Sequence, residues 1–412
     1  YDKTICLKKA MLEKMFPKNG EDKPQIRLGE FTDSWEQRKL GEITESYSGG
    51  TPSAANHSYY GGSIPFIRSA EINSINTELY LTEEGLNSSS AKLVEEGDIL
   101  YALYGATSGE VGISQINGAI NQAILAIKPK SKYDPNFIMQ WLRRQKNSII
   151  STYLQGGQGN LSGAIVKDLI LSVPIEYDEQ IRIGAFFKQL DNTIALHQRQ
   201  LSNYKEMKTA LLQKMFPKDG EKMPEVRFEG FTGEWEERKL GDVIVEYSDK
   251  DNSKLNPAVA VGKYGIRRRE DIYKKALSKD ISKNKVIRKN TLTIGMGSKQ
   301  IDIGILKTDE VFSVSPAYST FNIIDVDARY LDLFLQHENK NLSKVCMIIS
   351  ARQGKTVDKN LLVQYNVLLP SIPEQQKIAD FLFILDGQIE AQKAAFDALN
   401  RLKQGLLQQM FV

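Results

Sequence analysis

The sequence has few of the residues that build metal sites or disulfide bonds. Its 412 residues include two cysteines, Cys6 and Cys346, and three histidines, none at metal-ligand spacing. Two cysteines this far apart fit a reducing compartment, so we expect a cytoplasmic protein without a metal site. No apolar run approaches the roughly 18 residues of a membrane span, and no signal peptide is recognisable. We therefore expect no contact with a membrane.

An excess of charge of one sign is also missing. The chain has 54 Lys and Arg against 51 Asp and Glu, a net charge of +3. This balance does not predict nucleic-acid binding, so any basic surface must be local. The length exceeds what one core usually organises, so two or three domains are expected.

Catalytic motifs are faint or absent. A methyltransferase acting on an exocyclic amine would carry an Asp/Asn-Pro-Pro-aromatic loop, and the nearest string, residues 134–137, lacks the second proline. Residues 353–356 end like a phosphate loop, but Ile349 stands where that loop requires its first glycine. The glycines of residues 157–163 favour a tight loop over a dinucleotide site. We expect no catalytic residue, cofactor or metal on this chain.

What the sequence does have is a long internal repeat. Residues 179–216 return at 374–411 with a constant shift of 195, and Leu-Leu-Gln and Met-Phe are shared near both ends. In both copies apolar residues recur in steps of three and four, the spacing of a coiled-coil seam. Lys208 and Lys403 interrupt the two seams at the same place. Two matching stripes predict two helices, each roughly 50 Å long, that lie against each other. Two unrelated amphipathic helices are the alternative, which the extent of the repeat disfavours.

The N-terminus is a further repeat copy. Residues 14–24 reappear at 214–224, and the match continues to residue 41 with a shift of 200. Residues 1–30 are therefore expected to be a partial helical repeat. In each copy Phe-Pro and a following Asn-Gly or Asp-Gly end the helix and turn the chain.

Between the helical repeats lie two blocks of one pattern. In the first, short apolar runs at 63–68, 98–104, 123–127 and 169–174 predict strands, with a helix at 135–150. The second block predicts strands at 292–294, 303–306, 319–324 and 365–369 and a helix at 328–339, in the same order. The order repeats while the residues mostly differ. Each block is thus predicted to be a similar α+β domain with its own surface.

Positive charge collects between residues 263 and 289, where eleven Lys and Arg stand against three acidic residues. A solvated basic face is the ordinary interpretation of such a run. Two divergent domains joined by paired helices favour the other interpretation, in which this basic face binds a polyanion. Polar residues on loops would then recognise that polyanion. The candidate DNA-binding residues are Arg68, Tyr104, Thr107, Ser108, Gln158 and Asn160 in the first block and Lys263, Arg267, Arg268, Arg269, Lys283, Lys299, Gln300, Gln353 and Lys355 in the second.

The chain resembles the specificity subunit of a Type I restriction-modification enzyme over nearly its whole length. The resemblance rests on Pro-Glu-Gln-Gln-Lys-Ile at 373–378, on Trp-Glu-x-Arg-Lys-Leu-Gly at 35–41 and 235–241, and on the two Leu-Leu-Gln-containing helix ends. Residues 175–180, at the start of the first helical copy, differ from the Pro-Glu-Gln-Gln motif that begins the second copy.

The resemblance implies a role in bacterial defence, in which each block reads one half of a split target in double-stranded DNA. It also implies an antiparallel helical spacer that docks two modification (methyltransferase) subunits, with restriction subunits completing the complex. S-adenosylmethionine, ATP and Mg would then serve adenine methylation and DNA cleavage in the partner subunits. This chain would have no catalytic residue.

We therefore expect an α+β protein in which two similar target-recognition domains are separated by two long antiparallel coiled-coil helices. The expected boundaries are 1–30 (partial repeat), 31–174 (first recognition domain), 175–230 (central helical region), 231–370 (second recognition domain) and 371–412 (C-terminal helical region).

Apolar residues kept off the seam in both helices, Phe186 with Phe381 and Leu212 with Leu407, are candidate partner-docking residues; contact with the recognition domains is the alternative. Two other functions stay open. They are a self-contained methyltransferase or nickase, and a coiled-coil adaptor that binds RNA or protein.

Overall fold

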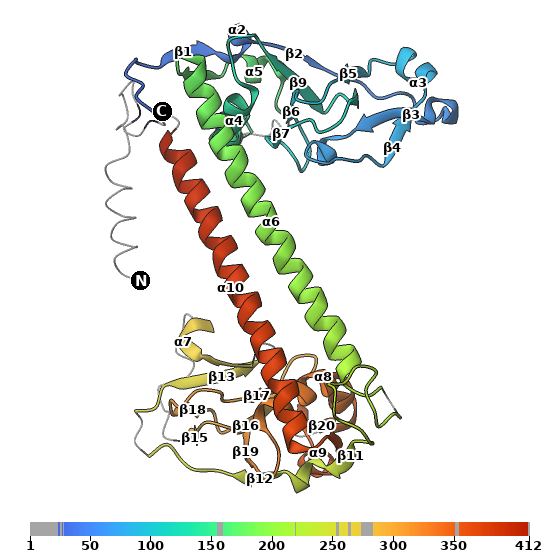
Figure 1. Cartoon of the computed structure of the whole chain (residues 1–412), viewed down its shortest axis with the longest axis vertical. Helices are drawn as coiled ribbons and strands as arrows, with labels where there is room; N and C mark the ends of the chain where they lie inside the picture. Colours follow the sequence, from blue (N-terminus) through green and yellow to red (C-terminus); the bar gives the residue numbers. More distant parts are fainter. Residues whose placement is uncertain are drawn as a thin grey trace. The chain divides into compact units, whose positions relative to one another are not determined.

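The computed structural model describes residues 24, 27, 29–154, 160–218, 220–252, 255–262, 265–272, 283–350 and 354–410. They form two compact units: Tyr1–Gln198 with Ala394–Val412, and Arg199–Lys393. Each unit contains one α+β domain and one half of each long helix (Figure 1). Most of the predicted N-terminal repeat, 1–23 with 25, 26 and 28, lies outside the described residues.

The first unit begins its domain with strand β1 and ends it with strand β10, which pairs with β1. Its domain elements are β1 (Glu36–Lys39), α2 (Leu40–Ile43), β2 (Thr44–Ser48), η1 (His57–Tyr59), β3 (Tyr60–Ile67), η2 (Ser69–Glu71), β4 (Leu79–Leu81), α3 (Glu83–Asn87), β5 (Lys92–Val94), β6 (Ile99–Ala102), β7 (Val111–Ile113), β8 (Gly118–Ile120), β9 (Ile124–Pro129), α4 (Pro135–Tyr153), α5 (Gly163–Lys167) and β10 (Ile170–Val173).

The second unit, without counterparts of η1 and η2 and with the additional strands β20 and β21, has a similar order of elements. They are β11 (Glu236–Lys239), η3 (Leu240–Asp242), β12 (Ile244–Tyr247), β13 (Ala258–Gly262), β14 (Gly265–Arg268), α7 (Arg269–Ile272), β15 (Lys285–Ile287), β16 (Thr291–Met296), β17 (Ile301–Ile305), β18 (Phe312–Val314), β19 (Ser319–Ile323), α8 (Ala328–Cys346), β20 (Met347–Ser350), β21 (Gly354–Val357), α9 (Lys359–Val363) and β22 (Asn366–Leu369).

The two domains share one sheet topology. The strand orders β2-β9-β6-β7 and β4-β3-β8-β5 in the first correspond to β12-β19-β16-β17 and β14-β13-β18-β15 in the second, and β1-β10 corresponds to β11-β22. Even the parallel pair has a counterpart, because β3 pairs parallel to β8 and β13 to β18. Among the described residues, the second domain alone has the hairpin β20-β21. The predicted strands and helices of both blocks are confirmed.

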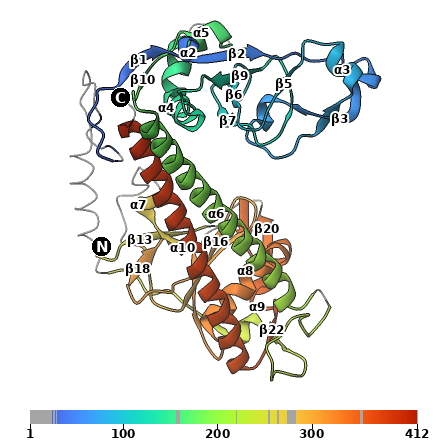
Figure 2. The same ribbon diagram turned by 45° about the horizontal axis from the view of Figure 1, so that its top comes forward.

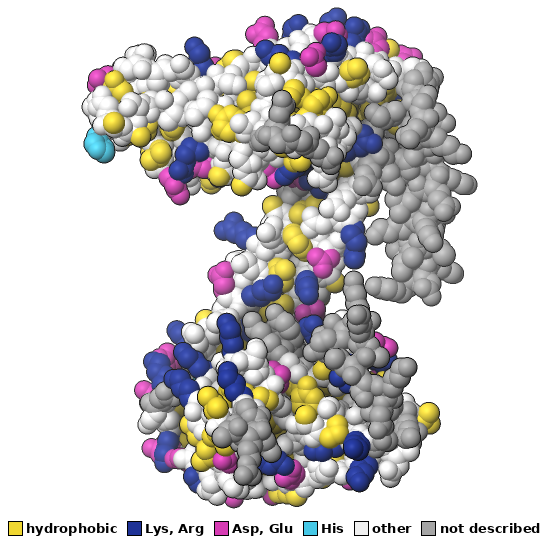
Figure 3. Space-filling model, turned by 180° about the vertical axis from the view of Figure 1, so that it is seen from behind, with side chains coloured by type: hydrophobic (Ala, Val, Ile, Leu, Met, Phe, Trp, Pro, Cys, Tyr) yellow, Lys and Arg dark blue, Asp and Glu magenta, His cyan; other side chains and the backbone are white. Residues whose placement is uncertain are grey.

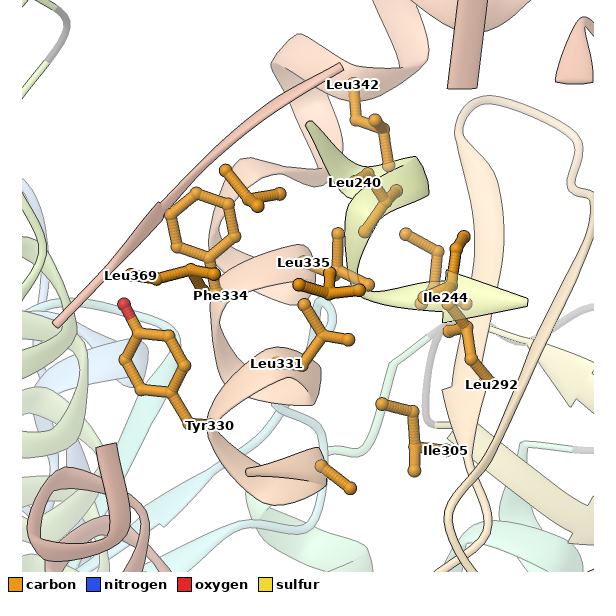
Figure 4. Packing of buried hydrophobic residues seen from close by; sticks show 14 of the residues in the cluster. Leu240, Ile244, Leu292, Ile305, Tyr330, Leu331, Phe334, Leu335, Leu342 and Leu369 are labelled. Atoms are coloured by element: carbon orange, nitrogen blue, oxygen red, sulfur yellow. The ribbon is translucent and has the colours of Figure 1, made fainter. Parts of the chain in front are cut away.

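Each domain core is built around one amphipathic helix. Asp134 and Asp327 cap α4 and α8, because their carboxylates accept from backbone N–H groups of the first turn. Figure 4 shows Leu331 and Leu335 of α8 pointing toward Ile244 and Leu292, while Tyr330 and Phe334 lie beside Leu369. The apolar stripe at helical spacing therefore covers the sheet, as the pattern predicts.

The long helices are α6 (Tyr177–Met215) and α10 (Ile372–Met410), of 39 residues each. Within each unit their halves lie side by side and run antiparallel (Figures 1 and 2). Lys403 pairs with Asp191 in the first unit and Lys208 with Asp386 in the second, and each pair's residue numbers add up to 594. Leu201, Leu385 and Ile389 form the apolar seam of the second unit. The predicted fold class is confirmed.

Candidate nucleic-acid interface

A buried ion pair fixes the start of each long helix to the segment that precedes its domain. The Arg227 guanidinium donates to both oxygens of Glu374, at 2.7 and 2.8 Å, and to the carbonyl of Gly233. Arg27 contacts Glu179 and the carbonyl of Asp33 in the same way. Hydrogen bonds to these carboxylates raise the pKa of both arginines. Both glutamates are fully buried, so a buried ion pair joins the long helix to the segment before the domain in each unit. We call these two pairs, Arg27–Glu179 and Arg227–Glu374, the clamps.

The glutamine that follows each glutamate joins three parts of the domain. The Gln375 side-chain oxygen accepts from the backbone N–H of Asp327 at 2.9 Å, and its amide donates to the carbonyl of Pro370 at 2.8 Å. Gln180 makes the equivalent bonds to Asp134, at 3.0 Å, and Pro174, at 2.9 Å. The Glu-Gln motif is thus a structural device shared by both units. Sequence reasoning found the motif but missed Arg27 and Arg227, although both belong to the repeat of shift 200.

In the first domain, two of the predicted DNA-binding residues, Arg68 and Ser108, form hydrogen bonds within the domain. Arg68 donates to Glu71 at 2.9 Å and to Glu78 at 2.5 Å, and these carboxylates raise the pKa of the guanidinium. Ser108 is buried and its hydroxyl donates to the carbonyl of Gly105 at 3.0 Å. The base contact of Ser108 stays a prediction, made for a hydroxyl that is buried here, and the charge of Arg68 is neutralised within the domain by Glu71 and Glu78.

The remaining candidates of the first domain lie on neighbouring loops. Tyr104 and Asn160 form an isolated antiparallel bridge, which joins the loop after β6 to the segment before α5. Asn160 is exposed, whereas Tyr104 and Thr107 are half-buried. Gln158 lies outside the described residues. The structure thus brings Tyr104 and Asn160 together, as loop residues that can present polar groups.

The second domain exposes more of its candidates. Arg267 at the end of β14, Lys283, Lys355 on β21, and Lys299 and Gln300 in the turn between β16 and β17 are exposed, and Arg269 is half-buried. Arg268 pairs with Glu310 at 3.0 Å, and its guanidinium lies 5.5 Å from the Phe312 ring centroid. Lys263 and Gln353 fall outside the described residues. Figure 3 shows Lys and Arg side chains spread over this unit's face, with fewer acidic ones between them.

The predicted docking residues differ in exposure. Leu407 is 7% exposed and belongs to the core of the first domain, so its assignment to a docking face is corrected: contact with the recognition domain explains it. Leu212 and Phe186 are half-buried against their own domains. Phe381 stays 37% exposed, with Phe383 and Ile384 on the same helix at 61% and 62%. The sequence analysis missed these last two, which have no apolar equivalent in α6.

Among the described residues, no group of His, Cys, Asp and Glu is arranged to hold a metal ion. The described helices also include none that is long and apolar enough to cross a membrane.

The two domains share one topology and one kind of ion-pair clamp, but they expose different residues. This combination defines a two-domain recognition protein. The family described as Type I restriction modification DNA specificity domain matches residues 32–204 and 232–401, so the chain belongs to this family. Its members are non-catalytic specificity subunits. The chain is therefore a DNA sequence-recognition subunit of a Type I restriction-modification complex, as its sequence predicts.

Two relatives illustrate the relationship. The chain is 21% identical over 338 residues to the Type I restriction enzyme MjaVIII specificity subunit of Methanocaldococcus jannaschii, covering 76% of this chain and 78% of that protein. It is similar in fold to the Type I restriction-modification system S subunit from M. genitalium, with a TM-score of 0.63 and 14% identity, over 94% of this chain and 98% of that one.

Proposed function

We propose that the chain reads a bipartite DNA target, with one half-site for each recognition domain, residues 31–174 and 231–370. The observation that carries this proposal is the pairing of one topology with two different sets of exposed loop residues. A shared scaffold with divergent loops is what two different sequences require, because scaffold residues position the protein and loop residues contact base edges.

Within the second domain, we assign base reading to Gln300 and phosphate contact to Lys283. An exposed amide can pair with adenine through two hydrogen bonds, whereas a lysine neutralises the backbone irrespective of sequence. Arg267, Arg269, Lys299 and Lys355 are further candidates here, and Tyr104, Thr107 and Asn160 are candidates in the first domain. Gln158, Lys263 and Gln353 stay candidates from the sequence alone.

The test is to sequence the methylated motif in cells that carry wild-type chain, Gln300→Ala or Lys283→Gln. Gln300→Ala should relax or abolish one half-site and leave the other unchanged. Lys283→Gln should lower methylation at every site alike and keep the motif. Equal loss on all sequences for both variants would reduce the second domain to a clamp that does not read bases.

We also propose that the helical regions, 175–230 and 371–412, dock two modification (methyltransferase) subunits. The exposed apolar residues Phe381, Phe383 and Ile384 make the first part of α10 the first candidate surface, since several large apolar side chains in water on one helical segment favour a partner. Phe186 and Leu212 follow as secondary candidates. Restriction subunits would join the same complex, in the cytoplasm. S-adenosylmethionine, ATP and Mg would act in the partner subunits.

The docking surface is tested with the double variant Phe383→Ser, Ile384→Ser. Light scattering of the chain mixed with modification subunits should show loss of at least one bound partner. Val245→Ser is the matched control, since Val245 is 50% exposed on a recognition domain rather than on the helices. Unchanged mass of the complex in the double variant would move docking to another surface.

A further inference from the structure

The strands β20 and β21 form a two-stranded ribbon that continues directly from α8 in the second unit. From its base outward the antiparallel pairs are Met347 with Val357, Ile348 with Thr356, Ile349 with Lys355 and Ser350 with Gly354. Opposite residues of such a pair share a face, and successive pairs alternate between the two faces. The pairs Met347–Val357 and Ile349–Lys355 therefore lie on the same face of the ribbon.

The base of the ribbon is anchored in the domain core, whereas its outer part is exposed. Met347 and Val357 are half-buried and pack against the hydrophobic core of the second domain. One pair further out on the same face, Ile349 is 81% exposed and Lys355 is exposed opposite it. The ribbon thus leaves the core between these two pairs. It holds a large apolar side chain in water, where burial against a partner would be favourable.

The ribbon emerges beside a turn that already carries predicted DNA contacts. This turn, between β16 and β17, exposes Lys299 and Gln300. The residue that ends it, Ile301, is fixed to the last turns of α8. Its backbone N–H donates to the Ser343 hydroxyl at 2.9 Å, and its carbonyl accepts from the Asn339 amide at 3.0 Å. Because β20 follows the end of α8 and β21 lies beside β16, the ribbon and the turn belong to the same end of the domain.

The charge of the ribbon indicates the kind of partner. Its sequence, residues 347–357, contains Arg352 and Lys355 and no Asp or Glu. Positive charge without an acidic neighbour suits a polyanion. Among the described residues, the first domain has no counterpart of this ribbon. A contact made by the ribbon should therefore concern one half-site and not the other.

We propose that the ribbon enters the major groove of the DNA target, where Ile349 contacts the methyl group of a thymine. This assignment rests on the proposed function. The major groove admits a two-stranded ribbon, and the thymine methyl group is the apolar group that it presents. Lys355, on the same face, supplies positive charge for a backbone phosphate. A modification subunit is the other partner that an exposed apolar side chain suits, and binding to it is a separate outcome of the test.

The test measures the affinity of the full chain for a duplex of its own methylated motif, in which each thymine in turn is replaced by uracil. Uracil lacks only the methyl group, so wild-type chain should lose affinity roughly fourfold at one thymine of one half-site. Ile349→Ala should bind the thymine duplex more weakly and show no further loss with uracil at that position. The matched control is Ile348→Ala, which shortens a 38% exposed side chain on the opposite face of the same strand and should keep the fourfold loss.

Sensitivity to one uracil in wild-type chain and in the control, together with insensitivity in Ile349→Ala, supports the thymine contact. If the chain discriminates its target from a random duplex but no uracil separates wild type from Ile349→Ala, the proposal is overturned and the proposed function stands. Wild-type DNA binding by Ile349→Ala with weaker binding of modification subunits in light scattering also overturns it, in favour of a protein partner. Failure of wild-type chain to discriminate its target overturns the proposed function, and this proposal with it.

Discussion

At the scale of single residues, the clamps Arg227–Glu374 and Arg27–Glu179 are the ion pairs whose loss we expect to lower the free energy of unfolding most. Arg227→Met leaves the Glu374 carboxylate, 1% exposed, without its cation. Breaking one side of a buried pair costs about 3–5 kcal/mol, so the free energy of unfolding should fall by that amount in denaturant titrations. Arg288→Met is the control, because Arg288 and Asp249 are both 56% exposed and such pairs contribute about 0–1 kcal/mol. Equal losses for the two variants would contradict this view of the clamp.

Cys346 gives a pH-dependent prediction. Burial of Cys346, the last residue of α8, raises the pKa of its thiol to about 11 from the usual 9.0. Because the folded state retains the proton more strongly, this contribution to stability is complete below pH 9 and is lost as pH rises toward 11. The peptide that contains Cys346 should therefore react slowly with iodoacetamide at pH 8 in the native protein and rapidly after denaturation, as mass spectrometry can measure. Rapid labelling of the folded chain would contradict the burial of this thiol.

At the scale of elements, the two seam ion pairs are equivalent by the repeat but differ in surroundings. Asp386 is paired with Lys208, whereas Asp191 serves Gln140, Arg143 and Lys403. Asp386→Asn should cost about 0–1 kcal/mol. Asp191→Asn should cost about 1.5–3 kcal/mol, since several hydrogen bonds to a charged group are lost. Denaturant titration of both variants checks the order, and a larger loss for Asp386→Asn would contradict it.

The internal repeat was the most informative feature of the sequence. The three-and-four spacing of its apolar residues and the constant shift between its two copies are enough to predict paired helices. Strands with long apolar runs were also predicted, because a buried strand must be apolar. The three-residue strands β5 and β8 were missed: so short a run has no readable alternation. The burial of Leu407 and Ser108 could not be predicted either. Their environment is set by α4 and by a turn of the loop after β6, which depend on tertiary packing rather than local pattern.

At the scale of the whole molecule, the register of α6 and α10 makes the spacer hypothesis testable. Insertions after Arg199 and after Ala394 both fall, in sequence, between the pair Asp191–Lys403 and the pair Lys208–Asp386, so they lengthen both helices between these pairs by the same amount. Seven residues in each helix preserve the heptad phase and add roughly 10 Å. At roughly 3.4 Å per base pair, the gap between the half-sites should grow by about three base pairs, with both half-sites unchanged.

Sequencing the methylated motif measures that gap directly. An insertion in α6 alone is the control, because it lengthens one helix and not the other between the pairs Asp191–Lys403 and Lys208–Asp386, so the two pairs cannot both keep their register. That variant should lose methylation, or fold poorly, rather than acquire a longer gap. If the paired insertion folds, methylates DNA and keeps the original gap, the helices do not set the spacing. The separation would then have to come from the recognition domains or the partner subunits.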